Sequence, residues 1–160
     1  MSVFLVVLLV LAVIGTGAMA GVFFAYSGFV IQGLDRMPHA SAARIMRSMS
    51  LASLRTPIVG TQFGTMLVGF VCTGLAVFGQ GGAAAPWIIG ATLVQLLGSV
   101  VVTAAATMPA NDRLANAADD DEVLTSAWLA FRAGWLTWNH VRTAASVLAC
   151  VGFAIALRLA

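Results

Sequence analysis

The chain has 160 residues, of which 61% are hydrophobic and only 9% are charged. A soluble domain carries about 25% charged residues, so this composition excludes a water-exposed surface, whereas a lipid bilayer solvates apolar side chains. All eight basic residues are arginine, and the net charge of +2 is too small and too scattered for a nucleic-acid groove.

Four long apolar runs predict four transmembrane helices within a single domain that covers residues 1–160. Their approximate spans are 3–31, 57–78, 86–108 and 135–157. A helix of the shortest run reaches about 33 Å, which exceeds the ~30 Å hydrocarbon core of a bilayer. We therefore expect an all-α integral membrane four-helix bundle with up-down-up-down topology.

The segment that follows the first span predicts a short interfacial helix over residues 41–55. Its apolar side chains recur at helical spacing opposite Arg44 and Arg47. They are Ala42, Ile45, Met46, Met49 and Ala52. This pattern is typical of a helix that lies on a membrane surface.

Arginine placement predicts the orientation in an inner or plasma membrane. An even number of spans puts both termini on one side and the connections 32–56 and 109–134 on the other. The connections and the adjoining start of the fourth span hold Arg36, Arg44, Arg47, Arg55, Arg113, Arg132 and Arg142. The terminal side has only Arg158, so the positive-inside rule predicts cytoplasmic long loops and outside termini.

Small and polar residues predict how the spans pack. Glycines and an alanine form stripes on the first two spans, where backbones can approach closely. The stripes are Gly17, Gly21, Ala25 and Gly28, then Gly60 and Gly64. In the third span Thr92, Gln95, Ser99 and Thr103 fall within about 80° of one another. This polar stripe fits either interhelical hydrogen bonds or a ligand-lined pocket.

The densest polar cluster lies at the start of the fourth span. Relative to Asn139, His140 lies about 100° round the helix and Arg142 about 60° the other way. Asn139 can therefore face the bundle axis between its two neighbours. A buried arginine in a membrane needs a partner, and the candidates are Asp112, Asp35 or an anionic ligand. Trp135 and Trp138 also fit an aromatic belt at the headgroups.

These residues suggest a general base beside anion-stabilising donors. A histidine takes up a proton near neutral pH, and arginine and amide groups stabilise an enolate or phenolate oxygen. The expected catalytic residues are His140, Arg142, Asn139 and Asn111. The expected substrate-binding residues are Tyr26, Gln32, Gln95, Ser99, Trp135, Trp138 and Asp112. The expected partners are the surrounding membrane lipid and a small hydrophobic aromatic substrate.

Metal and cofactor signals are weak. No transmembrane span carries a glutamate, and the two histidines have no zinc-ligand spacing to other residues. We predict no metal site and no cofactor, with haem on His39 or His140 as the alternative, since one histidine suffices to hold haem iron.

Three sequence blocks resemble the anthrone oxygenase-like family, which is also classified as a domain of unknown function. The blocks are Phe23-Phe24-Ala25-Tyr26-Ser27 with Leu34-Asp35-Arg36-Met37-Pro38, then Met108-Pro109-Ala110-Asn111-Asp112, then Trp135 to Thr143. The resemblance implies a four-helix membrane protein, and some relatives convert anthrones to anthraquinones with molecular oxygen. One departure is Thr107, where family members often have asparagine.

Residues and resemblance together predict a membrane-embedded oxidoreductase. It would oxidise a lipid-soluble phenolic or aromatic substrate with O2 through base-assisted carbanion formation. One alternative is a non-enzymatic module that binds haem or a quinone-like lipid. Another is a structural or transport protein, which would need a homo-oligomer because four helices alone cannot build a pore.

Overall fold

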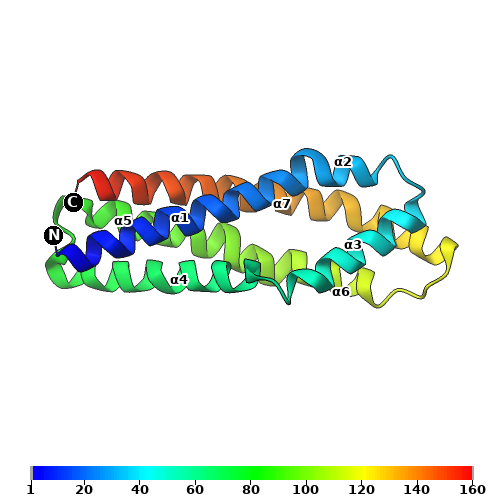
Figure 1. Ribbon diagram of the computed structural model, residues 1–160, viewed down its shortest axis with the longest axis horizontal. Helices are drawn as coiled ribbons and strands as arrows, with labels where there is room; N and C mark the ends of the chain where they lie inside the picture. Colours follow the sequence, from blue (N-terminus) through cyan, green and yellow to red (C-terminus); the bar gives the residue numbers. More distant parts are fainter. Residues whose placement is uncertain (1, 160) are drawn as a thin grey trace.

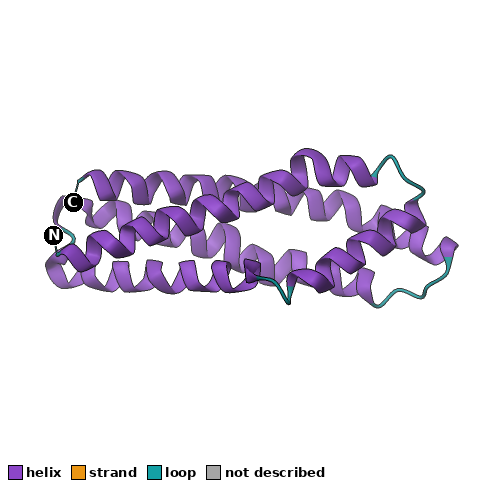
Figure 2. Cartoon of the chain, viewed as in Figure 1, coloured by secondary structure: helices purple, strands orange, loops and turns teal. Residues whose placement is uncertain are grey.

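The computed structural model describes residues 2–159, and within that range the chain is helical with no strand (Figure 2). The elements that carry the argument are α1 (Val3–Ala25), α2 (Ile31–Leu34), α3 (His39–Ser53), α4 (Pro57–Leu75), α5 (Ala85–Gln95), α6 (Met108–Ala115) and α7 (Asp121–Arg158). A π-helical turn joins α1 to α2, and two π-helical stretches join α5 to α6.

Four long helices run side by side in an elongated bundle, with both termini at one end (Figure 1). The helices are Val3–Leu34, Pro57–Gln80, Gly82–Ala115 and Asp121–Arg158, and each is long and apolar enough to cross a membrane. The chain is therefore a multi-pass membrane protein, and the prediction of an all-α four-helix bundle is confirmed. We call the end with the termini the terminal end, and the opposite end, which holds residues 34–56 and 112–132, the arginine-rich end.

Local sequence signals set the helix boundaries. The Ser2 hydroxyl accepts the backbone N–H of Leu5 at 3.3 Å and caps α1. Asp120 caps α7 in the same way, accepting the N–H of Glu122 at 3.0 Å. Between α4 and α5 the chain reverses through Gly79 at φ 90°, a conformation that favours glycine.

The helices at the arginine-rich end are longer than the predicted spans. α7 has 38 residues, or about 57 Å, and begins far before the predicted start at residue 135. The connection expected at 109–134 is therefore mostly helix, made of α6 and the first part of α7. The physical reason is a buried apolar stripe at helical spacing, formed by Leu124, Trp128, Phe131 and Trp135.

The helix predicted over residues 41–55 is present as α3, whereas its place on a membrane surface stays a prediction. Its apolar face, with Ala42 and Ala43 fully buried and Met46 nearly so, packs against α6 and α7. Arginines fix it there: Arg44 pairs with Asp119 and Asp121 at 2.8 Å each. These carboxylates hydrogen-bond the guanidinium and raise the pKa of Arg44.

The predicted glycine stripes are wrong for most positions. A Cβ added at Gly21, Gly60 or Gly64 would meet no atom within 4 Å, so these glycines face outward. Close approach occurs elsewhere. A Cβ on Gly15 would lie 2.0 Å from Thr65 Oγ1, and one on Gly98 would lie 2.4 Å from the Ala145 Cβ.

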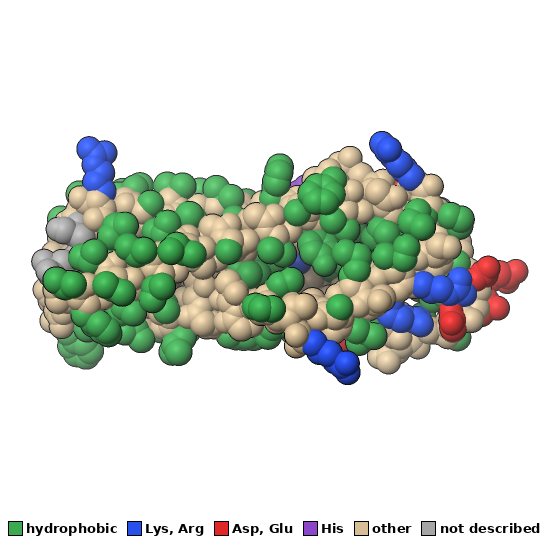
Figure 3. Space-filling view, in the orientation of Figure 1, with side chains coloured by type: hydrophobic (Ala, Val, Ile, Leu, Met, Phe, Trp, Pro, Cys, Tyr) green, Lys and Arg blue, Asp and Glu red, His purple; other side chains and the backbone are tan. Residues whose placement is uncertain are grey.

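Two apolar cores divide the bundle along its length. One, near the terminal end, includes Leu5, Leu9, Ile88 and Phe153. The other, at the arginine-rich end, includes Ile31, Met46, Leu114, Leu124 and Trp128. The polar side chains of α1 and α7 lie between the two cores. Figure 3 shows apolar side chains over most of the visible face, with most charges gathered at the arginine-rich end.

Candidate functional site

Asn139 is the centre of the polar layer between the two cores. It is fully buried on α7. Its Nδ2 donates to the carbonyl of Phe23 at 2.7 Å and to the Ser27 hydroxyl at 2.6 Å. Its Oδ1 accepts a hydrogen bond from the guanidinium of Arg142. Asn139 thus joins α7 to α1 and at the same time orients Arg142.

π-helical turns border this layer on two helices. Ser27 lies in the turn Tyr26–Val30, which follows α1. Ser99 and Thr103 lie in the stretches Leu96–Val101 and Thr103–Thr107, which follow α5. Such turns are rare and occur frequently at functional sites, because they displace side chains from the regular helical positions.

Arg142 is a buried cation without a carboxylate partner among residues 2–159. The residue is only 8% exposed. One guanidinium nitrogen donates to Thr103 Oγ1 at 3.3 Å, and the guanidinium carbon lies 4.2 Å from the centre of the Phe23 ring. Its Nε has no protein partner. A charge buried in this way is costly unless an anion joins it.

Of the three partners expected for Arg142, Asp35 is excluded by the structure. Asp35 instead binds Arg132, whose Nε donates to the two carboxylate oxygens at 2.6 and 2.8 Å. Asp112 lines the same cavity as Arg142 without an ion pair between them. Neither carboxylate pairs with Arg142, so an anionic ligand stays the predicted partner of its guanidinium.

Arg142 forms part of the wall of a cavity of about 310 Å³. The remaining wall comes from α1, the end of α3, the start of α4 and the helix from Val100 to Ala115, and it is mainly apolar. Its side chains include Met19, Phe23, Leu51, Leu54, Gln62, Phe63, Thr103, Thr107, Asn111 and Asp112. Figure 3 shows the surface hollowed between α1 and the junction of α3 with α4.

The cavity also has polar groups away from Arg142. Asn111 Oδ1 is buried and has no partner within residues 2–159. Gln62 Nε2 donates to the Ser99 hydroxyl at 2.9 Å, while Gln62 Oε1 is unpaired. Asp112 is exposed at the cavity edge. The structure thus brings Asn111, Asp112 and Arg142 to one cavity, as the sequence suggested.

Two further polar side chains lie behind the cavity wall. Gln95 is 1% exposed, and neither atom of its amide has a partner in the described part of the chain. Ser146, one helical turn beyond Arg142, is fully buried and its hydroxyl is also unpaired. Neither lines the cavity, and Ser99 reaches it only through Gln62.

The structure does not bring His140 or Gln32 into the cavity. Both are exposed, and neither lines the cavity wall. His140 follows the buried Asn139, and the rotation of about 100° per residue turns its side chain to the outside of the bundle. The prediction that His140 flanks the bundle axis is therefore wrong, because the axis lies on the side of Asn139 and Arg142.

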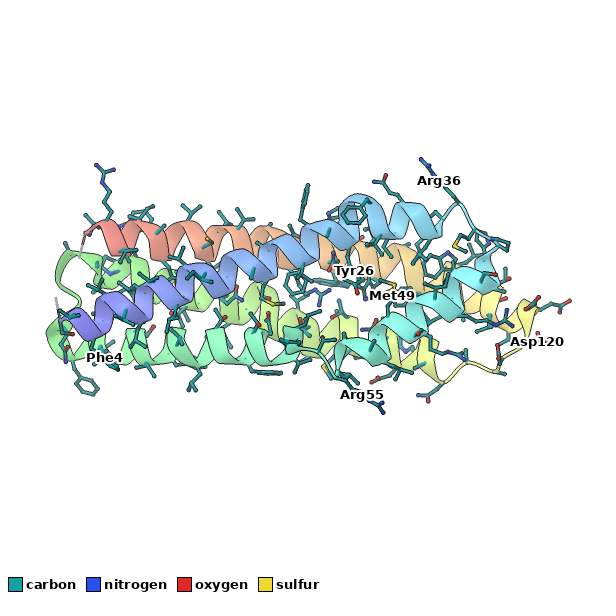
Figure 4. The ribbon with its side chains drawn as sticks, viewed as in Figure 1. Phe4, Tyr26, Arg36, Met49, Arg55 and Asp120 are labelled. Atoms are coloured by element: carbon teal, nitrogen blue, oxygen red, sulfur yellow. The ribbon has the colours of Figure 1, made fainter. Side chains whose placement is uncertain are left out.

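The aromatic candidates differ in burial: Trp135 and Tyr26 pack together inside the bundle, whereas Trp138 is exposed. Trp135 is 4% exposed, and its ring centre lies 5.6 Å from the Arg142 guanidinium and 5.8 Å from the Tyr26 ring. Tyr26 lies in the middle of the molecule, while Arg36, Arg55 and Asp120 point outward at the arginine-rich end (Figure 4). Trp138 is 45% exposed and lines a separate groove.

The histidines expected for haem stand apart from the cavity. His39 is half-buried at the start of α3, and His140 is exposed on α7; neither lines the cavity. Within residues 2–159 no three His, Cys, Asp or Glu side chains are grouped closely enough to hold a metal ion.

Sequence reasoning missed Phe23 and Gln62 as parts of the site, and it named Thr103 only as a member of the polar stripe of the third span. Phe23 contributes both its carbonyl to Asn139 and its ring to Arg142. Gln62 stands out in the sequence as an amide within an apolar span, so its burial could have been inferred. The contact of Phe23 with Arg142 depends on the pairing of α1 with α7, for which the sequence carries no direct signal.

Residues 54–152, more than half of the chain, match the family model described as anthrone oxygenase. The matched region covers α4, α5, α6 and most of α7, and it leaves out α1 and the first of the three sequence blocks. No curated protein and no solved structure matches the chain.

Proposed function

The chain belongs to the anthrone oxygenase family, and from this premise we propose that it oxidises a lipid-soluble phenolic substrate with O2 in the cavity beside Arg142. The observation that carries the proposal is the buried, carboxylate-free guanidinium in an apolar wall. Such a wall can pack against an aromatic ring system, and the guanidinium can donate hydrogen bonds to an anionic oxygen on that ring system.

Arg142 supplies the electrostatic part of the mechanism. Deprotonation of a carbon conjugated to a phenol or aryl ketone moves negative charge to the oxygen of an enolate or phenolate. A guanidinium held in place stabilises that charge more strongly in a low-dielectric cavity than in water. Asn139 and Thr103 hold the guanidinium before the ligand arrives, so little reorganisation is needed.

Asp112 takes the role of base in this proposal. It is the acidic side chain that lines the cavity among the described residues, whereas His140 lies outside it. A carboxylate can remove the proton from a ring methylene if the resulting anion is stabilised nearby. Asn111, with its unpaired buried oxygen on the same helix, can accept a hydrogen bond from a substrate hydroxyl.

The overall reaction balances with O2 as the oxidant. The methylene loses a proton, the carbanion is oxidised by O2, and a carbon–oxygen bond forms to give a hydroperoxide. The hydroperoxide loses water and leaves a ketone. One oxygen atom thus ends in the product and the other in water, and the two methylene hydrogens leave in that water.

The size of the cavity suits this substrate class. Its volume of about 310 Å³ is at the lower end of ligand pockets, which run from about 300 to 1,000 Å³. A fused aromatic system of modest size fits such a space, and the exposed Leu54 and Phe63 at its edge can contact the acyl chains from which the substrate would arrive.

The test is oxygen consumption and ketone formation by the purified protein with an anthrone as the probe. We expect Arg142→Met to lower kcat/KM by about a hundredfold or more, as loss of an oxyanion donor does elsewhere. Asp112→Asn should lower kcat, whereas His140→Ala should retain activity. Arg36→Met, a change at an exposed arginine outside the cavity, is the matched control.

Two outcomes would count against this proposal. Full turnover in both Arg142→Met and Asp112→Asn would remove the proposed mechanism. Saturable binding of the phenolic probe that Arg142→Met abolishes, without any oxygen consumption by the native chain, would indicate a binding module instead of an enzyme.

A further inference from the structure

A second hollow lies on a different face of α6 from the cavity, between α6 and the first part of α7. It has a volume of about 430 Å³. Alanines and Gly134 form half of its lining, Trp138 lies toward the apolar end of the groove, and Arg113 lies toward the arginine-rich end. We call it the α6–α7 groove. None of the side chains that line it also lines the cavity.

The groove extends from the apolar part of the bundle to the arginine-rich end. Along α7 its lining runs from Ala127 to Trp138, which is about 16 Å of helix. Residues 127–134 precede the apolar run 135–157, whereas Trp135 and Trp138 belong to it. Trp138 is 45% exposed, as is typical of tryptophan at the boundary between headgroups and acyl chains. The groove therefore covers the headgroup level and the outermost part of the hydrocarbon core.

Charge selects the kind of molecule that fits the groove. Arg113 is the charged side chain in its lining; it is exposed and makes no ion pair within residues 2–159. Arg44 and Arg132, by contrast, bind carboxylates of the protein. Trp135 also lines the groove, and its Nε1 is buried without an acceptor in the described residues. A matching ligand therefore has an anionic group for Arg113, an uncharged hydrogen-bond acceptor for Trp135 and an apolar chain.

We propose that the α6–α7 groove is a binding site for an anionic glycerophospholipid. The phosphate lies at Arg113, an ester carbonyl accepts from Trp135, and one acyl chain passes Trp138 into the hydrocarbon core. The bilayer around the protein is the source of this ligand. The site does not depend on the proposed enzymatic function, because it shares no lining residue with the cavity.

The first test measures quenching of tryptophan fluorescence by phosphatidylglycerol with brominated acyl chains. The full chain is purified in detergent and titrated with the lipid up to a small molar excess. We expect saturable quenching at one lipid per protein, and about fivefold weaker binding of brominated phosphatidylcholine. Arg113→Gln should bring the affinity for phosphatidylglycerol down to that for phosphatidylcholine, whereas the control Arg36→Gln should leave it unchanged.

A second variant blocks the acyl-chain part of the groove. A Cβ added at Gly134 would meet no atom within 4 Å, so Gly134→Leu can fill the groove without a clash. It should abolish the saturable quenching while thermal stability in detergent is retained. Gly90→Leu is the matched control, because its Cβ would also meet no atom and it lies on α5, outside the groove.

The proposal is overturned if the two lipids bind the native chain equally well. It is also overturned if Arg113→Gln keeps the preference for phosphatidylglycerol, or if Gly134→Leu binds the lipid as the native chain does. The Trp135→Phe/Trp138→Phe double variant locates the signal. Undiminished quenching in that variant would place the lipid near Trp87 or Trp128 and contradict the assignment to the groove.

Discussion

Asn139 and Arg142 show how a single amide can make a buried cation tolerable. The NH2 group of Asn139 donates to Phe23 and Ser27, and its oxygen accepts from Arg142, so both the donor and the acceptor side of the amide have partners. The ring of Phe23 covers the guanidinium face, which compensates part of the lost hydration. The guanidinium charge itself has no carboxylate partner among residues 2–159, and this is the feature on which the proposed anion binding rests.

Replacing Asn139 by leucine should destabilise the protein. The Phe23 carbonyl and Arg142 would lose their partner, and a buried unsatisfied group costs about 1–3 kcal/mol. The measurement is the free energy of unfolding in mixed micelles as the fraction of denaturing detergent rises. Asn116→Leu, at an exposed position in the turn after α6, is the control and should change little.

Replacing Gln95 by leucine should have the opposite effect and stabilise the protein. Its amide is buried without a partner, so Gln95→Leu removes two unsatisfied polar atoms and keeps a similar volume. The variant should be more stable than the native chain by about 1–2 kcal/mol in the same unfolding assay. Gln32→Leu, at an exposed position, is the comparison. A loss of stability in Gln95→Leu would contradict this prediction and would mean that a molecule bound to the folded protein hydrogen-bonds the Gln95 amide.

At the scale of the helices, close backbone contacts decide the packing. In a membrane there is little hydrophobic gain from bringing helices together, so van der Waals contact at small residues matters most. Gly98 and Ala145 bring the third helix against α7, on the same stretch of α7 as Arg142. This contact helps to set the distance between Arg142 and its hydrogen-bond partner Thr103.

Gly98→Ala should therefore separate the two helices. The added Cβ would lie 2.4 Å from the Ala145 Cβ, which cannot rotate away because it is attached directly to the backbone. We expect a loss of about 1–3 kcal/mol of stability. Gly90→Ala, where the new Cβ meets nothing within 4 Å, should be neutral or slightly stabilising. Equal stability of the two variants would contradict this packing.

At the scale of the whole molecule, the charge asymmetry between the two ends suggests how the protein lies in the membrane. Several arginines at the arginine-rich end, such as Arg44, Arg47 and Arg132, are held by protein oxygens, yet they still count as positive charge during insertion. We therefore propose that the arginine-rich end faces the cytoplasm and the termini face outward.

Single cysteines report this orientation. In a background with Cys72→Ala and Cys150→Ala, a cysteine is introduced either at Ala118, in the α6–α7 turn, or at Ala83, in the α4–α5 turn. Both positions are exposed. A membrane-impermeant maleimide added to intact cells should label Ala83→Cys and spare Ala118→Cys until the cells are opened. The reverse labelling would invert the proposed orientation.

Much of this architecture was predictable from the sequence, because long apolar runs have few alternatives in lipid. The extension of α7 was also encoded in the helical spacing of Leu124, Trp128 and Phe131. The sequence around these residues has fewer apolar residues than the four spans, so it resembles a loop. The exposure of Gly60 was not predictable, since small residues mark close contacts only where a partner helix lies opposite.

The candidate site was predictable only in part, namely where its residues lie on one helix. Helical rotation correctly grouped Asn139 with Arg142, because both positions lie on one face of a single helix. It could not place His140, because the direction of the bundle axis relative to α7 depends on contacts with α1. The engagement of Asp35 by Arg132 likewise depends on residues far apart in the chain.

The polar layer lies away from the middle of the membrane-crossing part of α7. Along the apolar run of residues 135–157, Arg142 is about 10 Å from the edge at the arginine-rich end and about 22 Å from the other edge. A dissolved aromatic compound thus has less than half as much hydrocarbon to traverse from one aqueous compartment as from the other. Under the proposed function, the compartment that adjoins the arginine-rich end is the favoured source of substrate, because a compound released on the far side would first have to diffuse through about two thirds of the bilayer.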